Sequence, residues 1–291
     1  MTPNGRPIAL TGVTGNLGGR IADRLAATDV PLRVLARDPA RVSPRLGLVD
    51  VRRAAFGDTQ AVTAALDGVD TVLMVSAAES ADRLEQHRSF VDAAAAAGVR
   101  HLVYVSFFGA APDATFTLAR DHYVTEQYLR AAGFAVTFLR DNLYADFLTG
   151  LVGEDGVIRG PAGEGRVAAV AQDDIADAAT TVLLDPAAHA GATYALTGPA
   201  ALTLSEIADT IGRVQGRRVR YHDETLAEAY GSRAGYGAPP WQLDAWVSTY
   251  TAIAAGELAG VSDDVERLTG HPATTLEEVL ARAAAAGRGG R

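Results

Sequence analysis

Three spaced glycines near the N-terminus have the types and spacing of a phosphate-binding turn. The segment Gly12 to Gly19, here called the glycine turn, follows an apolar run and leads directly into a helical stretch. Gly12 permits a tight turn, Gly15 lets the backbone approach a pyrophosphate, and Gly18 lets the helix pack closely on the strand. The positive end of that helix favours the pyrophosphate, so the segment predicts a dinucleotide site, with an ordinary glycine-rich connection as the alternative. The predicted contacts are Gly12, Thr14, Gly15, Asn16, Leu17 and Gly18.

The residue that follows the second apolar run indicates which dinucleotide binds. NAD sites commonly place a carboxylate there for the ribose 2′-hydroxyl, whereas an arginine accommodates the 2′-phosphate of NADP. Here the run 32–36 is followed by Arg37 and Asp38. The forked guanidinium of Arg37 suits a phosphate, so we expect NADP(H). Because of Asp38, NAD(H) remains the less favoured alternative cofactor. The non-functional alternative is that Arg37 is simply a solvated residue at the end of a strand.

A regular alternation of strands and helices positions these residues. Apolar runs predict buried strands at Ile8 to Val13, Leu32 to Ala36, Val49 to Phe56, Thr71 to Ser76, His101 to Phe107 and Ala135 to Leu139. Apolar spacing and alanine content predict helices at Leu17 to Ala27, Ala61 to Leu66, Asp82 to Ala97 and Leu118 to Ala132. Right-handed crossovers then give an α/β fold, a Rossmann-type doubly wound parallel sheet.

Beyond about Asn142 the alternation lapses, which predicts a smaller C-terminal α+β lobe. We expect an NAD(P)-binding domain over 1–142 and a substrate lobe over 143–291, with interleaved segments allowed. Short strands are expected at Val157 and Ile158, Val167 to Val170, Thr193 to Leu196 and Arg218 to Tyr221, and helices at Ile175 to Leu184, Leu204 to Val214 and over most of 224–286. Thr203 and Glu206 have capping-box spacing, and Asp173 with Asp174 is expected to cap the helix that follows it.

Several segments together resemble the NmrA-like branch of the short-chain dehydrogenase/reductase superfamily. They are the glycine turn, the strand end Leu35 to Pro39, the corner Phe56 to Asp58, the strand end Tyr104 to Ser106, the helix His122 to Glu126 and the segment Tyr194 to Pro199. The resemblance covers essentially the whole chain and is strongest to NADPH:quinone reductases and triphenylmethane-dye reductases. It implies an atypical Rossmann domain that holds NADP(H), with a small substrate lobe.

The same resemblance implies roles for residues at the other strand ends. It puts Gly57 and Asp58 beside the adenine, and Ser76 and Ala77 beside the nicotinamide ribose. Ser106 and Phe107 are expected to face the nicotinamide, and the substrate contacts are expected from Phe108, Asn142 and Tyr144. These places also agree with ligand binding outside the carboxyl ends of parallel strands. Capping and turn formation are the alternative roles.

The proton-donating Tyr-x-x-x-Lys pair of most short-chain dehydrogenases is absent. Tyr123 has Gln127 four residues later, and an amide cannot lower the pKa of a phenol as an ammonium does. In the NmrA-like pattern the lysine position falls on His122 and the tyrosine position on Leu118. His122 and Tyr123 are therefore the catalytic candidates, with His122 either an acid or a group that only orients the substrate.

Composition excludes several classes of protein. The formal net charge of -9 and the lack of a basic cluster argue against nucleic acid and anionic membranes. With no cysteine there is no disulfide or thiolate site, and the histidines lack metal-type spacing, so we expect no metal. No signal segment or membrane span is evident, which predicts a cytoplasmic protein. We also expect a monomer or a homodimer.

These residues favour an NADPH-dependent reductase of an apolar, conjugated acceptor such as a quinone, a dye or an aromatic natural product. Hydride transfer to such an acceptor needs positioning and little acid catalysis, which suits a site without the Tyr/Lys pair. A non-catalytic NADP-binding redox sensor is the second hypothesis. An isomerase or stereocontrol protein of a biosynthetic pathway is the third, because a fold does not determine a function.

Overall fold

The computed structural model describes residues 5–47 and 49–289, which form two compact units. The first unit comprises Met1–Phe107, Asp121–Arg140 and Ile175–Tyr194, and the second comprises Phe108–Arg120, Asp141–Asp174 and Ala195–Arg291. The chain therefore passes between the units several times, and no single cut in the sequence separates them.

A seven-stranded sheet with the order β3-β2-β1-β4-β5-β6-β9 forms the centre of the first unit. The strands are β1 (Ile8–Leu10), β2 (Leu32–Ala36), β3 (Asp50–Arg53), β4 (Thr71–Val75), β5 (His101–Phe107), β6 (Ala135–Asp141) and β9 (Thr193–Leu196), whose last residues belong to the second unit. The registers from β3 to β5 are parallel. The predicted Rossmann-type sheet is thus confirmed. β1 is shorter than expected because the chain already turns at Thr11 and Gly12.

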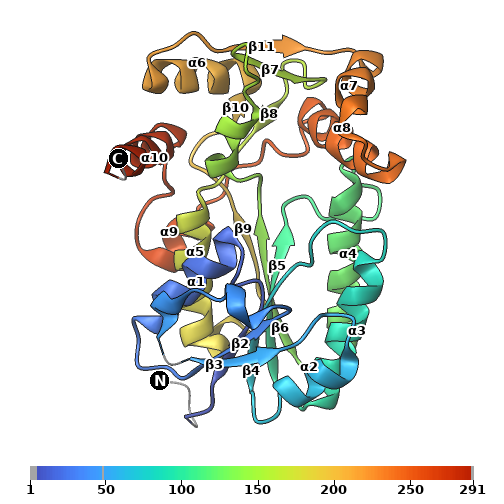
Figure 1. Cartoon of the computed structure of the whole chain (residues 1–291), viewed down its shortest axis with the longest axis vertical. Helices are drawn as coiled ribbons and strands as arrows, with labels where there is room; N and C mark the ends of the chain where they lie inside the picture. Colours follow the sequence, from blue (N-terminus) through green and yellow to red (C-terminus); the bar gives the residue numbers. More distant parts are fainter. Residues whose placement is uncertain (1–4, 48, 290–291) are drawn as a thin grey trace. The chain divides into compact units, whose positions relative to one another are not determined.

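Helices cover both faces of this sheet. They are α1 (Asn16–Ala26), α2 (Thr59–Ala65), α3 (Arg83–Ala96), α4 (Thr117–Ala131) and α5 (Gln172–Leu184). Figure 1 shows α1 and α5 on one face, and α2, α3 and α4 on the other. Three aromatic residues, Phe90, Tyr104 and Phe138, are fully buried in one apolar cluster. Through Phe90 on α3, this cluster packs the layer of α2, α3 and α4 against the sheet.

The second unit contains two small sheets and most of the C-terminal helices. β7 (Val157–Gly160) pairs in parallel with β11 (Arg220–Asp223), and β8 (Arg166–Val167) pairs antiparallel with β10 (Leu202–Thr203). The helices are α6 (Leu204–Gln215), α7 (Leu226–Arg233), α8 (Pro240–Ala254), α9 (Asp264–Thr269) and α10 (Leu276–Gly289). Short 3₁₀ segments are η1 (Pro39–Arg41), η2 (Pro44–Leu46), η3 (Ala145–Leu151), η4 (Pro186–His189) and η5 (Ala234–Tyr236).

Two local expectations in this part of the chain have different outcomes. The capping box of Thr203 and Glu206 at the start of α6 is confirmed. The cap assigned to Asp174 is wrong, because its carboxylate accepts hydrogen bonds from the amide and hydroxyl of Thr274. The amide of Gln172 at the start of α5 instead donates to Asp146, at 2.8 Å. None of the helices in the described ranges is long and apolar enough to span a bilayer.

Candidate functional site

The glycine turn has a geometry that only glycine permits at two of its positions. Gly12 has a φ of +71°, and a Cβ there would lie 2.8 Å from the Cβ of Val75. A Cβ on Gly18 would lie 2.3 Å from the carbonyl oxygen of Gly12, so α1 packs directly on the turn. The amide of Gly15 donates to the same oxygen, at 2.9 Å. This is the close packing of helix and strand that the sequence predicts for a dinucleotide-binding turn.

The start of α1 offers unsatisfied backbone donors at the surface of the first unit. Gly15 is its N-cap residue in an extended conformation, no side chain caps it, and its first turn contains no acidic residue. Thr14, Gly15 and Asn16 are exposed, whereas Leu17 and Gly18 are buried. The first amides of a helix carry partial positive charge and bind anions when no side chain takes them. The turn therefore fits a pyrophosphate, because the start of its helix is exposed and has neither a capping side chain nor an acidic residue in its first turn.

Arg37 and Asp38, at the end of β2, have different roles. Asp38 accepts a hydrogen bond from the amide of Ala40 at 3.1 Å and so begins η1, which uses its carboxylate locally. Arg37 is exposed. The register of β2 with β3 pairs Ala36 with Arg53, which is also exposed. Within residues 5–47 and 49–289 neither guanidinium makes an ion pair, so this strand end carries two open cations. Sequence reasoning missed Arg53, which strand register alone reveals.

The corner after β3 and the loop after β4 are both held by neighbouring helices. Asp58 caps α2 by accepting from the amide of Ala61 at 3.0 Å, while Gly57 is exposed. Ala77 is held at both backbone groups: its amide donates to Nε2 of His87 at 2.9 Å, and its carbonyl accepts from Nε of Arg83 at 3.0 Å. The loop of Ser76 and Ala77 is therefore positioned by α3.

His122 lies in a buried polar cluster, where both ring nitrogens are already paired. Arg83 donates to its Nε2 at 3.0 Å, which leaves the proton on Nδ1, 2.9 Å from the hydroxyl of Tyr104. Burial, together with the charge of Arg83, holds the pKa of His122 well below its ordinary value. A neutral imidazole with two partners holds other groups in place and is a poor proton donor at neutral pH.

The other residues expected beside the nicotinamide also have partners within the first unit. Ser106 is buried, and its hydroxyl donates to Glu126 at 2.6 Å, while Arg140 pairs with the same carboxylate through two bonds. The hydroxyl proton of Ser106 is therefore already engaged by Glu126. Phe107 is buried with its ring centroid 6.0 Å from that of His122.

Tyr123, the second catalytic candidate, is half-buried on α4, and Gln127 one turn later is exposed. The whole chain contains no lysine, so no other helix can supply the ammonium of a Tyr/Lys pair.

The substrate candidates belong to the second unit and differ in the hydrogen bonds that their polar groups make. Phe108 is half-buried, and its amide donates to the carbonyl of Asp141 at 2.8 Å. Asn142 is fully buried: its amide nitrogen donates to Leu258 O at 3.0 Å, and its side-chain oxygen accepts from the amide of Leu143. Asn142 thus connects backbone segments. Tyr144 is half-buried, and its hydroxyl donates to Asp141 at 3.0 Å.

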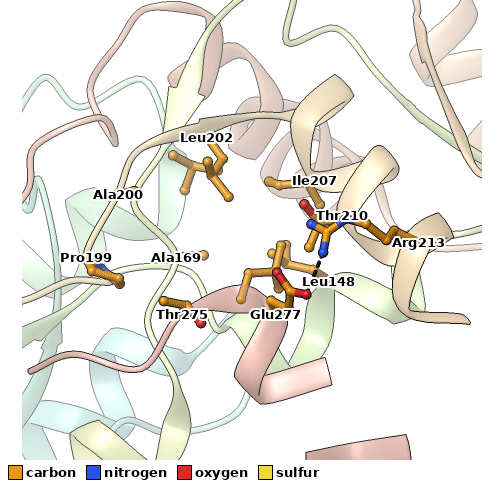
Figure 2. A pocket seen from close by; sticks show the side chains of 12 residues that line it. Leu148, Ala169, Pro199, Ala200, Leu202, Ile207, Thr210, Arg213, Thr275 and Glu277 are labelled. Atoms are coloured by element: carbon orange, nitrogen blue, oxygen red, sulfur yellow. Dashed lines mark hydrogen bonds and ion pairs between the residues drawn. The ribbon is translucent and has the colours of Figure 1, made fainter. Parts of the chain in front are cut away.

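The second unit also contains a cavity of about 180 Å³ that the sequence did not indicate. Figure 2 shows its largely apolar lining, which includes Leu148, Leu202 and Ile207. An exposed ion pair between Arg213 and Glu277, 2.5 Å apart, links α6 to α10 beside it.

Comparison with known proteins identifies the family of this chain. The model of the NmrA-like family matches residues 5–231, which is most of the chain. The chain belongs to the NmrA-like family.

Among its NmrA-like relatives, quinone oxidoreductase 2 of Escherichia coli is 34% identical, with 93% of this chain and 96% of the relative covered. NAD(P)H azoreductase of Xenophilus azovorans is 33% identical, with 96% and 98% covered. The structure of a triphenylmethane reductase of Citrobacter sp., complexed with NADP(H), superposes with a TM-score of 0.84 at 31% identity, covering 95% of this chain and 99% of that one.

Proposed function

We propose that this NmrA-like protein is an NADPH-dependent reductase that delivers hydride to an apolar, conjugated acceptor such as a quinone or a dye. The observation that carries the proposal is the glycine turn, where α1 packs directly on the strand end and begins, uncapped and exposed, as a dinucleotide pyrophosphate requires. Relatives that cover nearly the whole chain are named as reductases of quinones, azo compounds and triphenylmethane dyes, which supports the acceptor class.

The chain's own residues would hold the cofactor along the carboxyl edge of the sheet. The glycine turn binds the pyrophosphate, Arg37 the 2′-phosphate, and Gly57 with Asp58 borders the adenine. The loop of Ser76 and Ala77 borders the nicotinamide ribose, with the backbone of Ser106 and the ring of Phe107 nearby. Bound NADPH supplies the hydride. Phe108 and Tyr144 remain the proposed substrate contacts.

The surroundings of His122 and Tyr123 favour a conjugated acceptor over a simple ketone. Ketone reduction develops charge on one oxygen and depends on a strong proton donor. The chain has no lysine beside Tyr123, and His122 is neutral and paired on both sides. A quinone or dye spreads the incoming charge over its π-system, so correct positioning supplies most of the catalysis.

The experiment is to follow NADPH oxidation by the purified protein with quinones, triphenylmethane dyes and simple ketones, alongside titrations of NADPH and NADH binding. We expect turnover with quinones or dyes, little with ketones, and tighter binding of NADPH. Tight NADP binding without turnover of any acceptor would instead favour a redox sensor. Ketone reduction that is lost in Tyr123→Phe would overturn the proposed mechanism.

A further inference from the structure

Asp141, the last residue of β6, is a buried carboxyl group that none of the steps above uses. Its side chain is 3% exposed, and its Oδ2 accepts a hydrogen bond from the Tyr144 hydroxyl at 3.0 Å. Because it ends a strand of the parallel sheet, it lies at the carboxyl edge, where ligands bind in this class of fold.

The surroundings of Asp141 contrast with those of Glu126, another deeply buried carboxyl group. Glu126 is also buried, but two bonds from Arg140 compensate its charge. Within the two described ranges, no arginine or histidine makes an ion pair with Asp141. An isolated carboxylate in a buried site costs far more free energy than the neutral acid, so Asp141 retains its proton. In agreement, burial raises the pKa of Asp141 well above its ordinary value, and the bond from Tyr144 only partly offsets this.

We propose that Tyr144 and Asp141 form a proton-donating pair for acceptors whose reduction requires a proton. The inference rests on the proposed reductase function and names the group that completes it. Tyr144 is half-buried and would touch the acceptor, whereas Asp141 lies behind it and acts through the phenol. A neutral acid behind the phenol would take the place of the ammonium in the Tyr/Lys pair, because it can return a proton to the phenolate as it forms.

The proton balance distinguishes two kinds of acceptor. A quinone takes a hydride, which carries two electrons, and one proton to become a hydroquinone. Because the carboxyl group is protonated, the hydrogen bond between the two oxygens can run from Asp141 to the phenol, which leaves the O–H of Tyr144 for the quinone. That O–H bond breaks and its proton bonds to a quinone oxygen. The proton of Asp141 moves to the phenolate, and water then reprotonates Asp141. A cationic triphenylmethane dye needs no proton, because hydride bonds to its central carbon and gives a neutral product.

The experiment compares both acceptors in Tyr144→Phe and Asp141→Asn. We expect the kcat for quinone to fall roughly 10²-fold in Tyr144→Phe, as loss of a general acid implies, and less in Asp141→Asn. The kcat for the cationic dye should fall much less than the kcat for quinone in the same variant, because the dye needs no proton. Far-ultraviolet circular dichroism and NADPH titration report separately that each variant is folded and binds the cofactor. The matched controls are Tyr128→Phe and Asp92→Asn, a half-buried tyrosine and an exposed aspartate joined by the same kind of hydrogen bond at 2.7 Å.

A second measurement needs neither cofactor nor turnover. Infrared spectra of the cofactor-free protein at neutral pH should contain the C=O band of a protonated carboxylic acid, absent from Asp141→Asn and retained in Asp92→Asn. Equal loss of quinone and dye turnover in Tyr144→Phe would overturn the pair as a proton donor, as would unchanged quinone turnover or a missing band. An unmutated protein that reduces neither acceptor would overturn the proposed reductase function itself, and the donor role with it.

Discussion

Arg37 and Asp38 are adjacent in the chain, yet only the aspartate has its charged group engaged by the backbone. One carboxylate oxygen of Asp38 accepts from the amide of Ala40 and holds the start of η1, so only part of this carboxylate remains for a ribose hydroxyl. Arg37 is exposed, as is Arg53 on the neighbouring strand opposite Ala36, and a guanidinium suits a phosphate better than a neutral hydroxyl. At the scale of single residues, cofactor choice therefore depends on which side chains the backbone already uses.

Replacing Arg37 by Ala should weaken NADPH binding on the order of 10- to 100-fold and leave NADH binding nearly unchanged, because only NADPH loses a charge-assisted contact. Isothermal titration of both cofactors into both proteins measures this. Arg218→Ala, an exposed site with the same change of charge, is the control. Equal affinities for the two cofactors in the unmutated protein would contradict the NADP assignment.

Replacing His122 by Ala should affect stability more than chemistry. The change leaves the buried Arg83 without one partner, so we expect a loss of about 1–3 kcal/mol in the free energy of unfolding. Turnover of a conjugated acceptor should fall less than tenfold, and Tyr123→Phe should have a smaller effect still. Urea denaturation and NADPH oxidation measure the two properties, and a fall of 10²-fold or more in His122→Ala would identify a true general acid.

At the scale of elements, the glycine turn shows how one short segment serves both packing and binding. Gly18 holds α1 against the turn, whereas Gly15 begins the helix at the surface where an anion can approach. The two glycines therefore restrict substitution for different reasons, although both belong to one sequence pattern.

We expect Gly15→Val to abolish dinucleotide binding while the far-ultraviolet circular dichroism stays that of the folded protein. Its new side chain stands where the pyrophosphate approaches, and its Cβ lies 3.3 Å from the nearest backbone atom. Gly18→Ala should instead lower the free energy of unfolding by about 1–3 kcal/mol, because its Cβ meets backbone atoms that cannot yield cheaply. Cofactor titration and thermal melts of both variants separate the effects; retained binding in Gly15→Val would place the cofactor elsewhere.

At the scale of the whole molecule, buried neutral histidines couple folding to pH. Burial and, to a smaller extent, the nearby charge of Arg83 lower the pKa of His87 to about 3; the pKa values of His122 and His101 are shifted in the same direction. Between the folded pKa and the ordinary value of 6.5 the unfolded chain binds more protons. The contribution of these histidines to stability is therefore complete above pH 6.5 and is lost as the pH falls toward 3.

His87 alone should lose about 2 kcal/mol of stability between pH 7 and pH 5, since its pKa differs by several units between the folded and unfolded chains. Urea denaturation at both pH values measures it. His87→Gln should reduce the difference by that amount, whereas His222→Gln, which changes an exposed histidine, should leave it unaltered. An equal pH dependence in all three proteins would mean that His87 is not held neutral.

The sequence by itself determined the order of strands and helices in the first unit, the glycine turn and the place of Arg37. These features depend on local spacing, apolar periodicity and the lack of a Cβ, which neighbouring residues express directly. Tertiary structure alone decided which polar groups already have hydrogen-bond partners. The partners are distant in sequence: Arg83 bonds to His122, 39 positions away, and Asn142 to Leu258, 116 positions away. The hydroxyl of Ser106 and the side-chain amide of Asn142 proved to be hydrogen-bonded within the protein. Asp141 is buried without a counter-cation, and for that reason we propose that it carries a proton. Such properties follow from distance and burial in space, which the order of residues does not specify.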